Sequence, residues 1–214
     1  MRPERVVVVA GTATEIGKTW VTAAVAAELR RRGTDVRVRK PAQSFEPDDP
    51  TTDADELAGA TGEDPFVVCP ADRRYEVAMA PPMAADVLGR PPIVLADLAD
   101  EVTASWPDDP TAIGFVELAG GPRSPVAHDG DGVALAAALG PDVLLLVADA
   151  GLGTISSVRG ARDSFGELAG RMLVHLNRYD DGDDLHHRNR EWLVDADGFD
   201  VTTDIAALAD RLSL

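Results

Sequence analysis

Residues 11–19, Gly-Thr-Ala-Thr-Glu-Ile-Gly-Lys-Thr, constrain the fold more than any other part of the chain. They follow a β-branched run at 5–10 and precede an apolar-periodic stretch that runs from Lys18 to about Arg32. A strand, a glycine loop and a helix that opens with Gly-Lys-Thr form a phosphate cradle, because loop amides and the helix N-terminus point at the anion. The lysine neutralises phosphate charge, and the threonine hydroxyl can ligate Mg²⁺. We therefore predict a nucleotide triphosphate loop.

The spacing of this loop departs from the usual pattern by one residue. The usual pattern places four residues between its first glycine and the Gly-Lys pair. Here Gly11 and Gly17 enclose five, and Thr12 stands where that first glycine would be. The alternative is a chance Gly-Lys-Thr at a helix start, but the strand before it and the helix after it favour a phosphate loop.

Strand and helix patterns alternate along the rest of the chain. Continuous apolar strands separated by helices are typical of a parallel sheet covered on both faces. The sequence therefore predicts a doubly wound, mostly parallel α/β fold of the P-loop NTPase type, as a single domain over 1–214. The expected strands are 5–10, 35–39, 112–118, 143–148 and 171–176, and the expected helices are 18–32, a short one from Asp53, 83–88, 97–106, 132–139, 155–168 and 204–212.

Composition narrows the classes of partner. The formal net charge of −17 argues against binding to duplex nucleic acid, whose phosphates would be repelled. No apolar run approaches the length of a membrane span, and the first residues do not resemble a secretory signal. The single cysteine, Cys69, excludes an internal disulfide and fits a reducing cytoplasm. We expect a cytoplasmic protein with a small-molecule substrate.

Charged and glycine residues collect where the expected strands end. Ligands of open α/β sheets bind beyond the carboxyl ends of the strands, so these positions are candidates for the site. Taken singly, Lys40 also fits a surface lysine and Glu117 a solvated carboxylate. As a set that follows five strands, they favour a site: Lys18 and Thr19, Lys40 and Ser44, Glu117, Asp149 with Gly151–Thr154, and Asn177.

Three oxygen-bearing residues are candidates for Mg²⁺, which usually takes a few carboxylates together with phosphate oxygens. They are Thr19, Asp53 and Glu117. Asp53 has an alternative role as the N-cap of its helix, with Glu56 as the capping-box partner three residues later. Two lysines and Mg²⁺ at one site suit phosphoryl transfer, in which positioning and charge neutralisation do most of the catalysis.

Several of these motifs, in this order, resemble the dethiobiotin synthetase family. Residues 11–19 match the family's Gly-Thr-x-Thr-x-x-Gly-Lys-Thr, including the five-residue spacing. Four further segments resemble family motifs over residues 5 to about 178: Lys40-Pro-Ala-Gln-Ser44, Thr52-Asp53-Ala54, Val116-Glu-Leu-Ala-Gly-Gly121 and Gly151-Leu-Gly-Thr-Ile155.

The resemblance implies an ATP-dependent ligase of biotin biosynthesis. One amine of the vicinal diamine 7,8-diaminononanoate takes up CO₂ as a carbamate, ATP phosphorylates the carbamate, and the second amine closes the ureido ring with release of phosphate. The resemblance further implies ATP and Mg²⁺ as cofactors and a homodimer with the substrate tail near the subunit interface.

The resemblance also assigns roles to individual residues. The catalytic residues would be Lys18, Lys40, Thr14 and Ser44. Thr19, Asp53 and Glu117 would coordinate Mg²⁺, and Asn177 would read the adenine. The full nucleotide set would be Thr14, Glu15, Ile16, Gly17, Lys18, Thr19, Trp20, Glu117 and Asn177, and the substrate set Lys40, Ser44, Gly120, Gly121, Gly153 and Thr154.

Three departures from the family pattern leave the acceptor and the base open. Leu118 replaces a glycine, and Ser156-Ser157 replaces an Asn-His pair in the region that meets the substrate tail. After Asn177 the sequence shows no counterpart of the family's Ile-Pro-x-Leu segment. Two alternatives follow: a P-loop ATPase that acts on another amine or carboxylate, and a non-catalytic or switch ATP-binding protein. Switch ATPases of this group carry a second lysine early in the loop, and 12–16 contain none.

Overall fold

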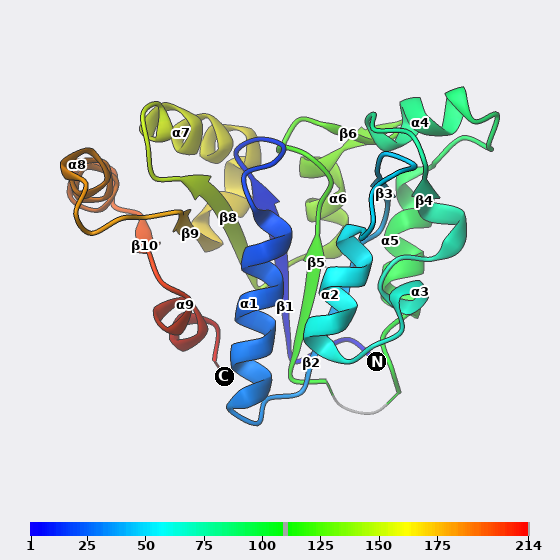
Figure 1. The fold of residues 1–214 in the computed structure, drawn as a ribbon, viewed down its shortest axis with the longest axis horizontal. Helices are drawn as coiled ribbons and strands as arrows, with labels where there is room; N and C mark the ends of the chain where they lie inside the picture. The colour runs from blue at the N-terminus through cyan, green and yellow to red at the C-terminus, as the bar shows by residue number, and fades with distance from the viewer. Residues whose placement is uncertain (109–110, 214) are drawn as a thin grey trace.

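A computed structural model describes residues 1–108 and 111–213, and a six-stranded sheet forms its centre (Figure 1). Within these residues the strand order is β10-β9-β8-β1-β5-β2, and every pairing in this sheet is parallel. The expected α/β class is therefore confirmed. The strands are β1 (Arg5–Gly11), β2 (Val36–Arg39), β5 (Ile113–Glu117), β8 (Val143–Asp149), β9 (Met172–Asn177) and β10 (Asp200–Thr202).

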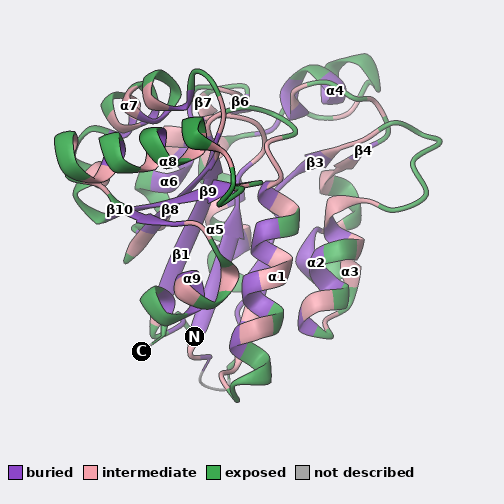
Figure 2. Ribbon diagram, turned by 60° about the vertical axis from the view of Figure 1, so that its left-hand side comes forward, coloured by how far each residue is buried: buried purple, intermediate pink, exposed green. Residues whose placement is uncertain are grey.

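Helices cover both faces of the sheet, and each face has its own apolar core. On one face lie α1 (Lys18–Arg31), α2 (Asp53–Thr61) and α9 (Ile205–Leu212). On the other lie α5 (Leu95–Ala104), α6 (Gly132–Leu139) and α7 (Thr154–Phe165). Figure 2 shows the strands as buried ribbons between helices that are buried along one side only. This pattern explains why the strands read as continuous apolar runs.

Shorter elements surround the carboxyl edge and the ends of the sheet. They include the two-stranded pairs β3 (Gln43–Ser44) with β4 (Arg74–Tyr75) and β6 (Pro125–Ala127) with β7 (Gly130–Asp131). The short helices are α3 (Pro65–Val68), α4 (Pro81–Val87) and α8 (Asp184–Glu191), the last followed by a π-helical turn at Trp192–Ala196. Within the described part of the chain, no helix is both long and apolar enough to cross a bilayer.

The short elements α3, β3, β4, β6 and β7 are not indicated by the sequence pattern, and neither are α8 and β10 near the C-terminus. The acidic, histidine-containing segment near 180–189 contains α8, whose N-cap Asp183 accepts from the Leu185 and His186 amides. The three-residue strand β10 pairs with β9 at the sheet edge. Local periodicity is weak in both segments, because α8 is mostly solvent-exposed and β10 is shorter than a typical strand.

One correction concerns the start of α2. The N-cap is Thr52, and Asp55 completes the capping box by accepting from the Thr52 backbone amide at 2.9 Å and from its hydroxyl at 2.7 Å. The expected Asp53–Glu56 capping box is therefore wrong by one residue. Asp53 occupies the first helical position, where its side chain is free to turn toward the sheet.

Two phenylalanines of different burial allow a test of which residues form the core. Phe115 of β5 is fully buried, and Phe66 of α3 is 58% exposed. We expect Phe115→Ala to lower the free energy of unfolding by about 3–5 kcal/mol through lost burial and a residual cavity. We expect Phe66→Ala to cost about 1 kcal/mol or less. Urea unfolding of both variants measures this, and equal losses would contradict the assignment of the core.

Candidate active site

The loop between β1 and α1 folds tightly around its own glycines. Glu15 and Gly17 have positive φ angles of 59° and 89°. A Cβ at Gly11 would lie 2.8 Å from Ile16 Cγ2 and 2.9 Å from Lys18 Cδ, so the loop passes too close for a side chain there. Lys18 Nζ donates to the Ala13 carbonyl at 3.2 Å across the loop. This arrangement is that of a phosphate loop with its lysine inside the cradle.

Asn177 at the end of β9 holds the loop in place. Its Nδ2 donates to the Ile16 carbonyl at 2.9 Å. A Cβ at Gly17 would lie 2.2 Å from the same Nδ2, so the contact requires a glycine for space as well as for its backbone angle. The expected proximity of the loop and Asn177 is thus present, through a direct contact.

A buried group of charges lies beside the loop. Lys40 Nζ is 2.6 Å from Glu117 Oε1 and 2.6 Å from Asp53 Oδ2. The Glu117 side chain is fully buried and that of Lys40 is 3% exposed, so neither behaves as the solvated surface charge considered above. Thr19 Oγ1 also donates to Glu117 Oε1, at 2.9 Å. The chain has two lysines, Lys18 and Lys40, and both lie at this site.

These charges shift one another's pKa. Burial lowers the pKa of Lys40, but Glu117 and Asp53 outweigh it, so the pKa lies above its ordinary value and the group stays an ammonium. Burial, then the nearby Lys40, lowers the pKa of Lys18. Burial raises the pKa of Asp53, but Lys40 outweighs it and the net shift is downward. The site therefore keeps the Asp53 carboxylate and the Lys40 ammonium charged beside Lys18, a lysine of weakened basicity.

The donor set fits Mg²⁺. Glu117 Oε2 is buried and has no hydrogen-bond partner among the described residues, and a buried carboxylate oxygen of this kind calls for a cation or a donor. The Thr19 hydroxyl and the Asp53 carboxylate lie around the same group. Oxygen ligands of this type suit Mg²⁺. Thr19, Asp53 and Glu117 would hold it, and it would supply charge neutralisation for phosphate oxygens.

A cavity of about 840 Å³ opens onto this group from the carboxyl edge of the sheet. Gln43 and Thr52 lie at its wall, and Ser44 Oγ donates to the Met79 carbonyl at 2.6 Å. Among the expected site residues, those that line the cavity are Thr14, Glu15, Gly17, Lys18, Thr19, Trp20, Lys40, Ser44, Asp53 and Gly120.

Leu118, one of the departures from the family pattern, does not obstruct this cavity. Its side chain is 1% exposed and packs in the core on the α6 side of the sheet. Its backbone amide donates to the Val9 carbonyl at 2.9 Å, so the chain follows the sheet as far as this residue. The loop turns afterwards at Gly120, whose φ is 68°.

Two expected substrate residues lie elsewhere. Gly153 lines a separate cavity of about 610 Å³ at the N-terminal end of α7. Thr154 is 4% exposed, and its Oγ1 has no partner among the described residues. Neither residue lines the cavity that holds Lys40 within this single chain. Gly121 lines a third cavity of about 460 Å³, together with Thr14.

No sequence pattern indicates the residues that complete a pocket around Asn177. A cavity of about 640 Å³ is lined by Asn177, Gly17 and Trp20 and also by Thr203, Asp204 and Ile205. The latter follow β10 and start α9, so this edge has a second wall facing Asn177 although the family's Ile-Pro-x-Leu segment has no counterpart. In the sequence, Asp204 before an apolar-periodic stretch predicts the start of a helix. It does not indicate which part of the protein that helix start faces.

Gly17 provides a test of the loop. We expect Gly17→Ala to weaken ATP binding at least roughly tenfold, because the added Cβ displaces Asn177. Gly33→Ala is the matched control: its φ of 92° carries the same backbone penalty, but nothing lies within 4 Å of the added Cβ. Titration with a fluorescent ATP analogue measures both. Equal affinities in the two variants would contradict the contact's role.

His175 makes stability depend on pH. It lies in β9 and contacts Thr202 Oγ1 at 3.0 Å, and burial lowers its pKa from 6.5 to about 4 against the opposing charge of Asp204. The unfolded chain therefore binds this proton below pH 6.5 while the folded protein does not until about pH 4. As the pH falls from 6.5 to 4, we expect the free energy of unfolding of wild type to decrease by up to about 3 kcal/mol more than that of His175→Asn. Denaturant unfolding at several pH values measures the difference, and parallel pH profiles would contradict it.

Comparisons with known proteins place the chain among sequence relatives. A family model described as "AAA domain" matches residues 5–166. An ATP-dependent dethiobiotin synthetase of Caulobacter sp. (strain K31) is 39% identical over 152 residues, or 70% of this chain and 65% of that protein. Its namesake in Haloferax mediterranei is 39% identical over 69% of this chain and 60% of that protein. A third, from Corynebacterium efficiens, is 37% identical over 76% and 72%.

Solved structures resemble the fold. Chloroplast FtsY from Physcomitrella patens has a TM-score of 0.56 and 17% identity, covering 99% of this chain and 66% of that one. FtsY from Elizabethkingia anophelis has a TM-score of 0.54 and 14% identity, with the same coverage. At such identities the likeness concerns the fold alone.

The matches cover most of this chain but only part of its relatives. The chain spans 65% and 60% of the lengths of the Caulobacter and Haloferax proteins. The family model covers the loop, both lysines and Glu117, and ends before Asn177. The family match and these identities together establish that the chain belongs to the AAA-domain family of that model and to the dethiobiotin synthetase family.

Proposed function

We propose that the protein is an ATP- and Mg²⁺-dependent ligase that converts 7,8-diaminononanoate, CO₂ and ATP into dethiobiotin, ADP and phosphate. The observation that carries the proposal is the buried Lys40, held at 2.6 Å from Glu117 in the same cavity as the phosphate loop. A fixed ammonium beside a phosphate cradle suits a reaction that brings an anionic acceptor to a γ-phosphate.

The proposed reaction has three covalent steps and needs no reactant other than the diamine, CO₂ and ATP. A neutral amine of the substrate attacks CO₂ and loses a proton, which gives a carbamate. A carbamate oxygen attacks the γ-phosphorus of ATP, and ADP leaves. The second amine then attacks the carbamoyl carbon, the C–O bond to phosphate breaks, and the ring closes with loss of a proton.

The two lysines would neutralise different negative groups of the reactants. Lys18, inside the loop, would contact the β- and γ-phosphates, as a P-loop lysine does. Lys40 would lie against the γ-phosphate and the carbamate, because its ammonium projects from the end of β2 into the same cavity. Both negative groups would otherwise repel each other, so a cation between them lowers the barrier to their approach.

Two hydroxyls would lie beside the diamine or its carbamate. Thr14 of the loop and Ser44 of β3 both line the cavity. We assign them hydrogen bonds to the diamine or its carbamate. Ser44 already donates to the Met79 carbonyl, so its oxygen is fixed in orientation and is left as an acceptor for an amine N–H.

The nucleotide base would lie in the cavity beside Asn177. With Nδ2 committed to Ile16, the Asn177 Oδ1 is the amide atom left to accept from an exocyclic amine such as that of adenine. The indole of Trp20 is 54% exposed and lines the same cavity, which supplies apolar area for a base.

The proposal includes a homodimer in the cytoplasm. Leu152, before α7, has a side chain that is 92% exposed, and Trp192 is 52% exposed. A partner subunit that covered these two side chains would remove their apolar area from water. The buried free thiol of Cys69 is compatible with a reducing compartment.

Phosphate release from Mg-ATP and bicarbonate, with and without 7,8-diaminononanoate, tests the proposal. We expect the diamine to stimulate release, and we expect Lys18→Ala to reduce the stimulated rate at least a hundredfold, because the γ-phosphate loses its nearest cation. Arg30→Ala is the matched control, since Arg30 is an exposed cation at the far end of the same helix.

Two results would overturn the proposal at different levels. No stimulation by millimolar diamine would exclude the ligase while leaving the ATP site in place. Unchanged turnover in Lys18→Ala would show that residues 11–19 are not the loop that binds the phosphates of ATP.

A further inference from the structure

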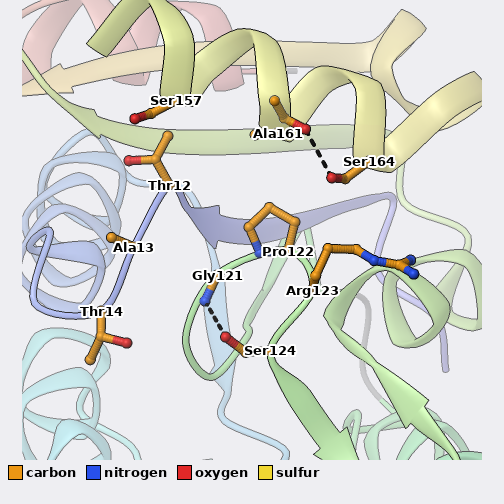
Figure 3. Close-up of a pocket in the computed structure, with 11 residues that line it drawn as sticks. Thr12, Ala13, Thr14, Gly121, Pro122, Arg123, Ser124, Ser157, Ala161 and Ser164 are labelled. Atoms are coloured by element: carbon orange, nitrogen blue, oxygen red, sulfur yellow. Dashed lines mark hydrogen bonds between the residues drawn. The ribbon is translucent and has the colours of Figure 1, made fainter. Parts of the chain in front are cut away.

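Asp53 and Glu117, two of the residues expected to hold Mg²⁺, are anchored in different ways. Glu117 is the last residue of β5, and the connection after it is closed by the Gly121 amide, which donates to Ser124 Oγ at 2.9 Å (Figure 3). Asp53 instead starts α2, and the chain reaches it through residues 46–51, all of which are exposed. Because an exposed loop packs against little, the position of Asp53 depends on the contacts of α2 itself.

Gln43 of β3 supplies contacts on both sides of Asp53. Its Oε1 accepts from the Ala54 amide at 2.9 Å, and its Nε2 donates to Thr52 Oγ1 at 3.1 Å. The first amides of a helix have no partner inside the helix, so the Gln43 oxygen satisfies one that is buried. Gln43 is itself 2% exposed and follows Lys40 by three residues. A single amide side chain thus brackets the residue that contacts Lys40.

The Thr52 hydroxyl is the point at which these contacts meet. It accepts from Gln43 Nε2 and from an Arg74 guanidinium nitrogen at 2.6 Å, and it donates to Asp55 Oδ2 at 2.7 Å. A hydroxyl has one donor and two acceptor positions, so all three are in use. Gln43 and Arg74 are register partners in the β3–β4 pair. This pair of strands therefore holds the start of α2 through two side chains.

We propose that Gln43 is a positioning residue, which sets the start of α2 so that the Asp53 carboxylate lies beside Lys40 and the metal position. The inference rests on the proposed function, because coordination of Mg²⁺ by Asp53 is part of it. The Asp53 side chain is 43% exposed and lies 2.6 Å from Lys40 Nζ, so burial alone does not fix its orientation. Outer contacts orient the ligands of a metal, and their loss weakens metal affinity roughly 10- to 100-fold.

Binding of Mn²⁺ to the full-length protein tests this inference, with Mn²⁺ as the probe for the Mg²⁺ position. The protein is saturated with a non-hydrolysable ATP analogue, and bound Mn²⁺ is measured by electron paramagnetic resonance. Gln43→Met keeps the length of the side chain and removes both hydrogen bonds, so we expect Mn²⁺ affinity to fall at least roughly tenfold. We expect binding of a fluorescent ATP analogue in EDTA to stay unchanged, because these bonds go to α2 and its N-cap.

A double-mutant cycle separates the positioning of Asp53 from a general loss of stability. Asp53→Ala removes the carboxylate, and we expect it to weaken Mn²⁺ binding by at least as much as Gln43→Met does. If Gln43 acts through Asp53, adding Gln43→Met to Asp53→Ala weakens binding little further. A loss from Gln43→Met that is equally large in both backgrounds would overturn the inference.

A pair of threonine variants keeps the test decisive if Gln43→Met does not fold. Thr52→Val removes the hydroxyl to which Gln43 and Arg74 donate, and we expect the same selective loss of Mn²⁺ affinity. Thr51→Val makes the same change one residue earlier, at an exposed position, and we expect it to keep the wild-type affinity. Equal Mn²⁺ affinities in the two threonine variants would contradict the inference.

The outcomes separate this inference from the proposed function. If Gln43→Met binds Mn²⁺ as tightly as wild type while Asp53→Ala does not, Asp53 remains a ligand and its positioning by Gln43 is wrong. If Asp53→Ala leaves Mn²⁺ binding unchanged, the metal position in the proposed function is wrong and the inference fails with it. Absence of diamine-stimulated phosphate release in wild type would exclude the ligase reaction, while selective loss of Mn²⁺ affinity in Gln43→Met would still support the inference.

Discussion

The buried pair of Lys40 and Glu117 is the interaction on which the site depends. Taking two such charges out of water is costly unless each has a close partner, and here the separation is 2.6 Å. The sheet register brings them together: Arg39 of β2 lies opposite Val116 of β5, so the next residue of each strand is the lysine and the glutamate. Removal of either one would leave the other charge buried and unpaired.

The remaining parts of the site are arranged around this pair by the strand order. β1 lies between β5 and β8, so the phosphate loop leaves the sheet directly beside Glu117, and Thr19 donates to the same carboxylate oxygen. β9 follows β8, and Asn177 at its end contacts the loop from the other side. A parallel sheet thus brings the phosphate loop, the buried ammonium and the cavity beside Asn177 to one edge.

Features carried by local sequence were predictable, and those that depend on distant contacts were not. The loop, the strands and the polar strand ends follow from residue type and period, so the sequence predicts Lys18, Lys40 and Glu117 at one site. The capping box was misplaced by one residue because Thr52 and Asp53 both suit an N-cap, and the choice depends on Lys40 holding Asp53. The wall formed by Asp204 comes from a segment far from the loop in sequence, where no short pattern indicates what it faces.

The most direct test follows the oxygen atoms. The protein, Mg-ATP and 7,8-diaminononanoate are mixed with ¹⁸O-labelled bicarbonate in unlabelled water, and the first phosphate released is analysed by mass spectrometry before the label exchanges. If the carbamate is phosphorylated and the ring then closes, the C–O bond breaks and we expect each phosphate to carry one oxygen from the bicarbonate. Phosphate without label, released at the same diamine-dependent rate, would show that water attacks ATP and would contradict the carbamate mechanism.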